Sequence, residues 1–488
     1  MECPELNSNL KGASQQDVDK VTQVFERLGL KTVDANAATR TVRLSGTAEA
    51  MENAFLVRLF NYAHASGNYR GRVGHVHVPD EVSDMVEGVF GLDNRRVARR
   101  RRQPVREAVR ARIPQSVPAA WYTPGQLAAR YHFPSGNGAG ETVGLLEFGG
   151  GYFAQDLKKF CALAGVAMPA VKTVSTDGTA TDAKDGAEGE VMLDVEVVAG
   201  VCPKATIVVY FADWTEQGWI AILDAVTQDG VNDPGVVSVS WGYAEDADIW
   251  TEQAMTQVNQ SLLEAAHLGI TVCVAAGDDG SSDAIGDGLA HVDFPGSSPY
   301  VLCVGGTTIP SKTGTAPDIV WKEGDGLRAD NGGSTGGGVS AVFDRPAWQA
   351  NVTVAPVNPG AKAGRVLPDV AANADWDVSP YLLVVDGGAQ PNGGTSAAAP
   401  LWASLIALVN AHRGADKIGY VTPVLYESGS AGGGTAGARG CMDVTSGNNT
   451  TDAIGGYTAG MGYDAVSGWG TPDGVKLLAA LGELAALP

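Results

Sequence analysis

Gly393-Gly394-Thr395-Ser396-Ala397-Ala398-Ala399-Pro400 is the stretch that decides how this chain is interpreted. Two glycines bring a serine to the start of a run of small residues, and an apolar helical pattern continues through residues 401–409. At a helix N-terminus, unpaired backbone N–H groups and the helix dipole favour nearby negative charge. A serine there suits a nucleophile that attacks a carbonyl group and must tolerate an oxyanion. The alternative is that Ser396 only caps an ordinary buried helix.

A nucleophilic serine needs a base, and in the familiar triad this base is a histidine held by an aspartate. From residue 120 onward the chain contains four histidines, which are His132, His267, His291 and His412. None of them stands in a His-Gly-Thr-His setting, and His267 and His412 fall late in helical patterns. A histidine-dependent triad is therefore not supported.

Carboxylates offer another base, in the helix-like run Glu188-Gly189-Glu190-Val191-Met192-Leu193-Asp194-Val195-Glu196. Glu190 and Asp194 stand four residues apart, which stacks both carboxyl groups on one face of a helix. Like charges at that spacing repel, so the pKa of at least one group should rise and a proton can be shared. The alternative is that these acids form the solvated face of a surface helix.

The composition is that of an acidic globular chain of 488 residues, 44% hydrophobic and 18% charged, with a net charge of −21. Such acidity argues against nucleic acids and anionic membranes as partners. The charge is uneven, because residues 1–116 carry 18 basic and 14 acidic side chains, a net of +4, while the remainder carries −25.

The pattern of residues 1–94 predicts a small α+β domain. Helical spacing of apolar residues is found over 14–30, 47–60 and 79–89, and strand-like alternation over 41–44 and 75–78. An Arg- and Pro-rich stretch follows over 95–119. We expect it to be a solvated, protease-sensitive linker and not a nucleic-acid-binding segment.

Residues 120–488 alternate between strand and helix patterns, which indicates an α/β domain with a mostly parallel sheet covered by helices on both faces. Strands are expected at 143–148, 205–211, 236–240 and 271–276, and helices near 153–164, 187–200, 215–228 and 251–268. From residue 277 to the Ser396 helix the chain is glycine-rich and is expected to be mostly loop, as are residues 429–439.

The six cysteines show no CxxC or ladder spacing. Cys273 and Cys303 lie in apolar runs and are predicted to be buried thiols, while for Cys161 and Cys202 the sequence leaves a disulfide open. We find no apolar run of about 18 residues that would predict a membrane span. Met1-Glu2-Cys3-Pro4-Glu5 is no signal peptide, so export would need another route or a leader absent from this sequence.

Ser396, the Glu190/Asp194 pair and Ala275-Ala276-Gly277-Asp278-Asp279-Gly280 together resemble the sedolisin family, the serine-carboxyl peptidases, and in particular its kumamolisin-like members. Nearly the whole chain takes part, with matching motifs in family order at Tyr122-Thr123-Pro124, Leu146-Glu147-Phe148-Gly149-Gly150-Gly151-Tyr152, Ser240-Trp241-Gly242, His291-Val292-Asp293-Phe294-Pro295 and Gly460-Met461-Gly462-Tyr463-Asp464. The resemblance implies a subtilisin-like peptidase domain over 120–488, a linker to be cleaved over 95–119, and a ferredoxin-like activation prodomain over 1–94.

The resemblance also implies roles for single residues. Ser396 would be the nucleophile, Glu190 its general base and acid, and Asp194 the partner that orients Glu190. Asp278 would be the oxyanion-hole residue, which must be protonated to donate a hydrogen bond, so acid pH is part of the implied mechanism. Further matches are Glu147 and Trp241 in a network behind the Glu/Asp pair, and Asp293 near the substrate pocket.

A calcium site is implied as well. Asp443 and Asp464, with the carbonyl groups of Val444, Gly460 and Gly462, match the family's single structural Ca²⁺. Two carboxylates and loop carbonyls form the hard oxygen donor set that Ca²⁺ prefers.

We therefore expect the precursor of an acid-acting endopeptidase that hydrolyses proteins or peptides through an acyl-enzyme. Its own prodomain would inhibit it until self-processing, and the mature part would be secreted and monomeric. The alternative is an inactive relative that keeps the fold as a binding or scaffold protein, against which the intact set of Ser396, Glu190, Asp194 and Asp278 argues. One departure from the family pattern is Asp279, where related sequences often carry a small hydroxyl residue. It adds a carboxylate near Asp278 and leaves the working pH open.

Overall fold

The computed structural model describes residues 12–63, 68–97, 99–100, 116–247, 249–312, 316–330, 332–429 and 433–484. Within residues 120–484 the centre is one eight-stranded sheet in the order β14-β13-β11-β9-β6-β8-β7, with β19 also paired to β13. Its strands are β6 (Thr142–Glu147), β7 (Ala170–Ser175), β8 (Thr206–Phe211), β9 (Val236–Val239), β11 (Thr271–Ala275), β13 (Leu302–Thr308), β14 (Ile319–Val320) and β19 (Val370–Asn373). Every pairing is parallel except β13 with β14.

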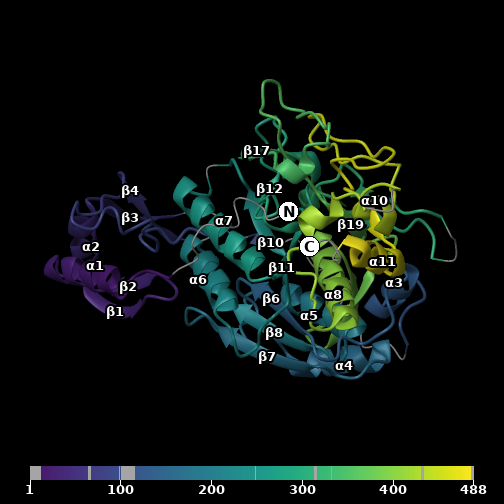
Figure 1. The fold of residues 1–488 in the computed structure, drawn as a ribbon, viewed down its shortest axis with the longest axis horizontal. Coiled ribbons are helices and arrows are strands. Elements are labelled where there is room, and N and C mark those ends of the chain that lie inside the picture. Colours follow the sequence, from purple (N-terminus) through teal and green to yellow (C-terminus); the bar gives the residue numbers. More distant parts are fainter. Residues whose placement is uncertain are drawn as a thin grey trace.

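Helices cover both faces of this sheet, as the sequence predicted (Figure 1). Successive strand residues point to opposite faces, so Leu145 belongs to one apolar core and Leu146 to the other. The first face is covered by α4 (Ala154–Ala164), α5 (Glu188–Val201) and α8 (Thr395–Arg413), and the second by α6 (Glu216–Thr227) and α7 (Glu252–His267).

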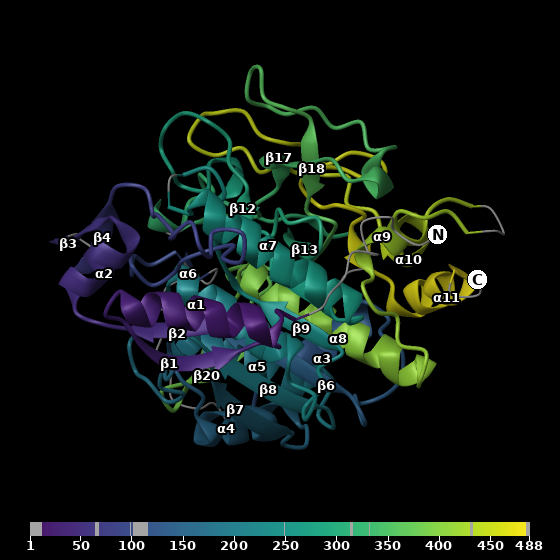
Figure 2. The same cartoon turned by 60° about the vertical axis from the view of Figure 1, so that its left-hand side comes forward.

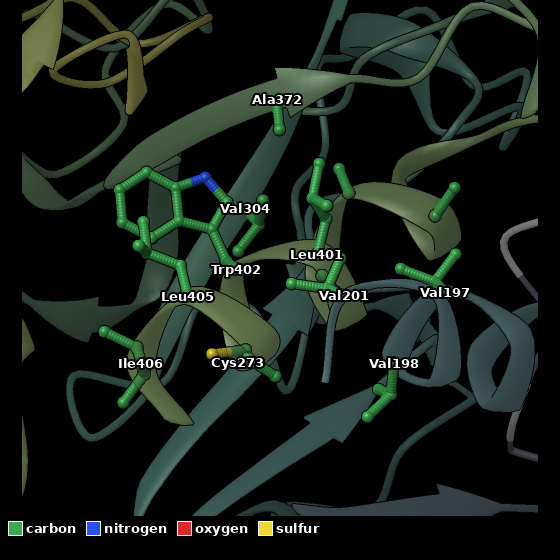
Figure 3. Packing of buried hydrophobic residues seen from close by; sticks show 14 of the residues in the cluster. Val197, Val198, Val201, Cys273, Val304, Ala372, Leu401, Trp402, Leu405 and Ile406 are labelled. Atoms are coloured by element: carbon green, nitrogen blue, oxygen red, sulfur yellow. The ribbon is translucent and has the colours of Figure 1, made fainter. Parts of the chain in front are cut away.

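The helices α5 and α8 are buried almost along their whole length. A helix that is apolar on all sides belongs inside a protein, because no face of it gains from contact with water. Figure 3 shows Leu401, Trp402, Leu405 and Ile406 of α8 among Val197, Val198 and Val201 of α5 and residues of β11, β13 and β19. The Ser396 helix is thus a central element of the core.

The N-terminal unit is α+β, with its own core built around Val24, Phe25, Leu30 and Phe55. Its elements are α1 (Gln15–Arg27), β1 (Lys31–Asn36), β2 (Thr41–Ser45), α2 (Ala48–Phe55), β3 (Arg58–Tyr62) and β4 (Tyr69–Val73). The strands pair as two hairpins, β1–β2 and β3–β4, whereas a ferredoxin-like unit would join them in one sheet.

Three local expectations for this unit were wrong. The helix expected over 47–60 ends at Phe55, and residues 58–60 belong to β3. Residues 75–78 form no strand, and residues 79–89 form a turn over 80–85 and no helix. The apolar residues of the second segment still serve the core, because Val82 is buried. The segment is short, rich in β-branched residues and interrupted by Gly88, all of which disfavour a helix.

The N-terminal unit lies beside α6 and α7, and both views place its purple ribbon against these helices (Figures 1 and 2). Arg40 forms an ion pair with Glu264 of α7. Gln253 Nε2, also on α7, donates to the backbone oxygen of Val89 at 3.0 Å. The unit therefore packs on the helices of the second sheet face.

The region from 277 to 395 holds more strand than expected. Its remaining strands are β12 (Asp293–Phe294), β15 (Lys322–Glu323), β16 (Gly333–Ser334), β17 (Gly338–Asp344), β18 (Gly364–Leu367), β20 (Tyr381–Val385) and β21 (Gly388–Asn392), with single 3₁₀ turns at η3 (Gly280–Ser282), η4 (Arg328–Asp330) and η5 (Ala347–Gln349). They lie mostly in short two-stranded pairs that lack a long apolar alternation. The loop expected over 429–439 likewise contains most of α10 (Ala436–Gly440). The strand β7 was not predicted, and four of its six residues are exposed.

The other elements are β5 (Arg99–Arg100), α3 (Pro124–Arg130), β10 (Trp241–Ala244), α9 (Thr422–Leu425), β22 (Cys441–Met442), β23 (Thr471–Pro472) and α11 (Gly474–Leu484). The boundaries at 94 and 119 stay a prediction, and most of the linker, residues 101–115, lies outside the described residues. Cys161 and Cys202 are both free thiols, and Cys273 and Cys303 are buried as predicted. Among the described residues no helix is both long and apolar enough to cross a membrane.

Candidate active site

Ser396 is the second residue of α8 and is completely buried. The two glycines before it are required by the backbone. Gly394 has φ +100°, which residues with a Cβ avoid. A Cβ on Gly393 would lie 2.4 Å from the carbonyl oxygen of Ala374. The turn that delivers Ser396 therefore passes too close to its neighbour for a larger residue.

Ser240, which follows β9, connects Ser396 with Asp194. Its hydroxyl lies 2.7 Å from Asp194 Oδ2 and 3.2 Å from the backbone oxygen of Ser396. This carbonyl lacks its normal helical donor because the residue four positions later is Pro400, which has no N–H. The Ser240 hydroxyl is a donor within reach of both oxygens, so it links Asp194 on α5 with Ser396 on α8.

Glu147, Glu190 and Asp194 form a buried carboxyl cluster, and each is fully enclosed. Burial raises the pKa of Asp194 well above its usual value, the charges of Glu147 and Glu190 add to this, and the Ser240 hydrogen bond partly offsets it. Burial likewise raises the pKa of Glu147, although Trp241 Nε1 donates to its carboxyl at 3.0 Å. The alternative of a solvated acidic face is therefore wrong for Glu190 and Asp194.

Asp278 follows β11 and is held against the residue that precedes Ser396. The backbone N–H and the hydroxyl of Thr395 both donate to Asp278 Oδ1, at 2.8 and 2.7 Å. The other oxygen, Oδ2, is buried and makes no hydrogen bond within the described residues. Burial raises the pKa of Asp278 to about 6, against the opposing effects of Arg328 and of the Thr395 hydrogen bonds. One oxygen is thus fixed, and the other is available as a donor once protonated.

The edge of the site is formed by a small sheet in the order β12-β10-β5. The linker strand β5 pairs antiparallel with β10, with Trp241 opposite Arg100 and Gly242 opposite Arg99. Asp293 lies on β12 and is buried, and a Cβ on Gly277 would come within 2.4 Å of its carboxyl oxygen. The linker and Asp293 therefore both reach the surroundings of Asp278 and Trp241.

The residues expected at a calcium site converge in two loops near the C-terminal end of the chain. The backbone N–H of Gly462 donates to Asp443 Oδ2 at 2.8 Å, and that of Gly460 donates to Asp464 Oδ2 at 2.9 Å. Asp464 is largely buried, and burial raises its pKa. Two carboxyl groups and the loop that carries the expected carbonyl donors therefore lie together.

Sequence reasoning missed the parts played by Ser240, Thr395 and Arg328. Ser240 and Thr395 stand inside the quoted motifs Ser-Trp-Gly and Gly-Thr-Ser. The motifs identify these residues but do not indicate that they form hydrogen bonds with Asp194 and Asp278. Arg328, whose side chain pairs with Asp279, stands in a glycine-rich stretch with no motif that points to it.

Known protein families match both parts of this chain. The Pro-kumamolisin activation domain model matches residues 5–95, and the Subtilase family model matches residues 175–420. Kumamolisin from Bacillus sp. (strain MN-32) is 42% identical over 480 residues, which cover 96% of this chain and 84% of that protein. The chain belongs to the sedolisin family. It is accordingly a serine-carboxyl peptidase that carries an activation domain.

The sequence and a solved structure of Pseudomonas sedolisin support the assignment to the sedolisin family. Sedolisin from Pseudomonas sp. (strain 101) is 30% identical over 96% of this chain and 79% of its own length. The solved structure of Pseudomonas sedolisin, a serine-carboxyl proteinase complexed with two molecules of pseudo-iodotyrostatin, matches with a TM-score of 0.63 and 30% identity. That match covers 74% of this chain and 98% of the sedolisin chain. The subtilisin-like fold is thereby confirmed.

A stability prediction follows from Glu196, two residues beyond Asp194 on α5. Glu196 is fully buried, accepts a hydrogen bond from the Val384 N–H at 2.8 Å, and burial raises its pKa well above the usual value. A folded-state pKa above the unfolded one gives stability that is fully present below the unfolded pKa and is lost as pH rises through the folded pKa. Glu196→Gln, which stays neutral, should reduce the fall in Tm between pH 4 and pH 7 by about 1–2 °C for each kcal/mol of linkage removed.

Tm should be measured in a Ser396→Ala background, with the exposed Glu427→Gln as the matched control. A pH dependence that is equal in the parent and in Glu196→Gln would contradict this account of Glu196.

Proposed function

We propose that this chain is the precursor of an acid-acting endopeptidase whose catalytic residues are Ser396, Glu190, Asp194 and Asp278. The observation that carries the proposal is the Asp278 carboxyl, tied by Thr395 beside the nucleophile with its second oxygen buried and without a partner among the described residues. A pKa of about 6 leaves this group protonated, and thus a donor, in acid. Ser396 and the Glu190/Asp194 pair lie on the adjoining helices α8 and α5.

In the proposed reaction, Ser396 Oγ attacks the carbonyl carbon of the peptide bond while Glu190 takes the hydroxyl proton. The carbonyl oxygen becomes negative and receives a hydrogen bond from protonated Asp278. When the carbon–nitrogen bond breaks, Glu190 returns its proton to the leaving amine and an acyl-enzyme remains. Water then attacks the ester by the same route, with Glu190 again as base, and Ser396 is regenerated. Asp194 orients Glu190 and is itself anchored by Ser240.

Substitution of the nucleophile tests the function directly. Ser396→Ala should abolish both self-processing and the cleavage of casein, because the alanine has no oxygen to attack the carbonyl. Mass spectrometry after incubation in acid gives the readout, and the wild-type chain is the control. Removal of the prodomain by the variant unaided would exclude Ser396 as nucleophile. A folded wild type that cleaves neither itself nor casein would instead favour the non-catalytic binding protein. If the protein releases tripeptides and makes no internal cuts, its activity is that of a tripeptidyl-peptidase and not of an endopeptidase. Tripeptidyl-peptidase is the activity named for several relatives.

The oxyanion role of Asp278 makes a pH prediction. The wild type should lose kcat/KM as pH rises through about 6, because ionised Asp278 can no longer donate. Asp278→Asn keeps an N–H donor at every pH. The upper limb of its pH profile, the range where kcat/KM falls as pH rises, should therefore move toward neutral pH. Asp278→Ala should lose activity by ~10²–10³ at its best pH. Profiles measured on folded protein decide the matter, and an Asp278→Asn limb that stays where the parent's lies would refute the role.

We further propose that Asp443, Asp464 and the carbonyl groups of Val444, Gly460 and Gly462 hold one Ca²⁺. The Asp443 and Asp464 carboxylates each accept a hydrogen bond from the backbone of residues 460–462, which holds both near one loop. Together with backbone carbonyl groups, two carboxylates make an oxygen donor set that fits Ca²⁺ and suits softer metals poorly. The ion would neutralise the two carboxylates and hold their loops together.

Removal of calcium should therefore lower stability. An ion that binds only the folded state stabilises it by mass action, by about 2.7 kcal/mol at 100 times its Kd. Tm should be higher in millimolar Ca²⁺ than in EDTA, and an Asp443→Asn/Asp464→Asn variant should lose this difference. Equal Tm values for the wild type after verified stripping of the metal would remove the site.

The prodomain is proposed to act as an intramolecular inhibitor. Support comes from β5, which occupies the edge of β10 next to Trp241, and from the Arg40–Glu264 ion pair that fastens the unit to α7. Asp224 on α6 faces the same part of the prodomain. Burial raises its pKa to about 7, although Arg40 and Arg43 lower it. The mature part is proposed to be secreted and monomeric, as the resemblance to the family implies, which cell fractionation and gel filtration test.

Loss of the Arg40 contact should weaken prodomain retention. After self-processing of the full chain, Arg40→Ala should release its prodomain at lower NaCl concentration than the parent, with affinity reduced about tenfold. The matched control is Arg58→Ala, since Arg58 is exposed and its partner Glu52 lies within the prodomain. Coelution of prodomain and catalytic part on gel filtration gives the readout. Equal salt profiles for Arg40→Ala and Arg58→Ala would contradict the proposed fastening.

A further inference from the structure

Asp279 places a second buried carboxyl group directly next to Asp278. A free negative charge there would oppose the negative charge that develops at an oxyanion, because like charges repel strongly in a buried site. Arg328 Nε donates to Asp279 Oδ2 at 2.9 Å, and Nη2 makes a second, shorter contact with the same oxygen. The Arg328 backbone N–H donates to Asp279 Oδ1, also at 2.9 Å. One residue thus binds both oxygens of the Asp279 carboxylate.

Arg328 belongs to a strap, residues 321–330 and 332–336, that crosses the loop after β11. The strap makes two further contacts, since the N–H of Ser334 donates to the backbone oxygen of Asp278 at 3.0 Å and that of Gly336 to Gly277 at 2.8 Å. From the other side, the Thr451 hydroxyl donates to the backbone oxygen of Asp279 at 3.2 Å. The Asp278-Asp279 dipeptide is therefore held between two segments far apart in the sequence.

The charged groups around Asp278 come from three elements. They are Arg328 on the strap, Asp279 and Asp283 on the loop after β11, and Asp293 on β12. From α8, Thr395 adds only hydrogen-bond donors. After the dominant effect of burial, Arg328 lowers the pKa of Asp278 while Asp279 raises it. The strap thus supplies a positive charge against the surrounding acids.

We propose that Arg328 is a positioning residue of the reaction, which aligns Asp278 beside Ser396 by binding Asp279 and which offsets the charge of Asp279. Together, Arg328 and Asp279 set the upper pH limit of catalysis. This inference rests on the proposed role of Asp278, because Arg328 acts through that residue and not on the substrate.

Removal of the Arg328 charge and removal of the Asp279 charge should shift the upper limb, the alkaline side of the pH profile of kcat/KM, in opposite directions. Arg328→Met leaves Asp279 unneutralised, so the pKa of Asp278 rises and the limb moves to higher pH by about one unit. Asp279→Ser leaves Arg328 without its carboxylate, so the limb moves to lower pH by a similar amount. The double variant should lie between the two. A merely structural role would lower kcat or Tm in each variant without opposite shifts of one limb.

The profiles should be recorded on mature enzyme prepared from the full-length precursor, with Tm measured for each variant. Arg130→Met is the matched control, because it breaks another partly buried arginine–aspartate pair, with Asp318 at 2.7 Å, and should leave the limb in place. If Arg328→Met does not fold, Arg328→Lys replaces it. Lysine keeps the positive charge but lacks the planar guanidinium that binds a carboxylate through two N–H groups. Asp279 would be held less firmly, so kcat should fall while the upper limb stays near that of the parent. A limb that moves in Arg328→Lys as far as in Asp279→Ser would contradict the proposal.

Asp278→Asn separates failure of this inference from failure of the proposed function. If Asp278→Asn keeps the parent's limb, the oxyanion role is wrong. If Asp278→Asn moves the limb, but Arg328→Met and Asp279→Ser move it in one direction or not at all, the role of Arg328 is wrong and the proposed function stands. Within the Asp278→Asn background, Arg328→Met should leave the limb unmoved, and a shift there would show that Arg328 acts on another group.

Discussion

Removal of carboxyl groups from water is the constraint on which this structure depends. The carboxyl groups of Glu147, Glu190 and Asp194 are buried, and so is that of Asp278. In the proposed reaction, Asp278 acts together with Glu190 and Asp194. An ionised carboxylate in such surroundings costs several kcal/mol unless it is paired. The protonated state avoids this cost, and it is also the state in which Asp278 can donate to an oxyanion. For Asp278, the stability of the interior and the proposed chemistry therefore favour the same protonated state, whereas Glu190 has to be ionised to act as the base.

The N-terminal unit and the linker use different physical means to hold the precursor together. The unit is fastened to α6 and α7 by side chains, among them Arg40, and this contact depends on charge. The linker strand β5 adds to β10 through main-chain pairing, which does not depend on which side chains it carries. A strand edge that accepts one extended segment in this way offers the same main-chain groups to other extended segments.

The large helices and strands, the candidate nucleophile and the candidate carboxyl pair could be predicted from the sequence. The parallel strands and the helices around them have long apolar patterns, and Ser396, Glu190 and Asp194 stand at spacings that carry chemical meaning. The strands between 277 and 395 were not predicted, because they are two to seven residues long and lie in a glycine-rich stretch without a long apolar alternation. The segment 79–89 shows the converse error, since its apolar spacing fitted a helix while its backbone forms turns. Arg328 was out of reach because its partner Asp279 lies 49 positions away and only the folded chain brings them together.

The cysteines have a consequence for the chemical environment that the protein tolerates. All five cysteines among the described residues are free thiols, namely Cys161, Cys202, Cys273, Cys303 and Cys441. Burial raises the pKa of the Cys161 thiol to about 11 and that of Cys202 to about 12, which keeps the reactive thiolate scarce. The described part of the molecule is thus held by packing and hydrogen bonds without a covalent cross-link. This part of the molecule therefore contains no disulfide that a reducing medium could break.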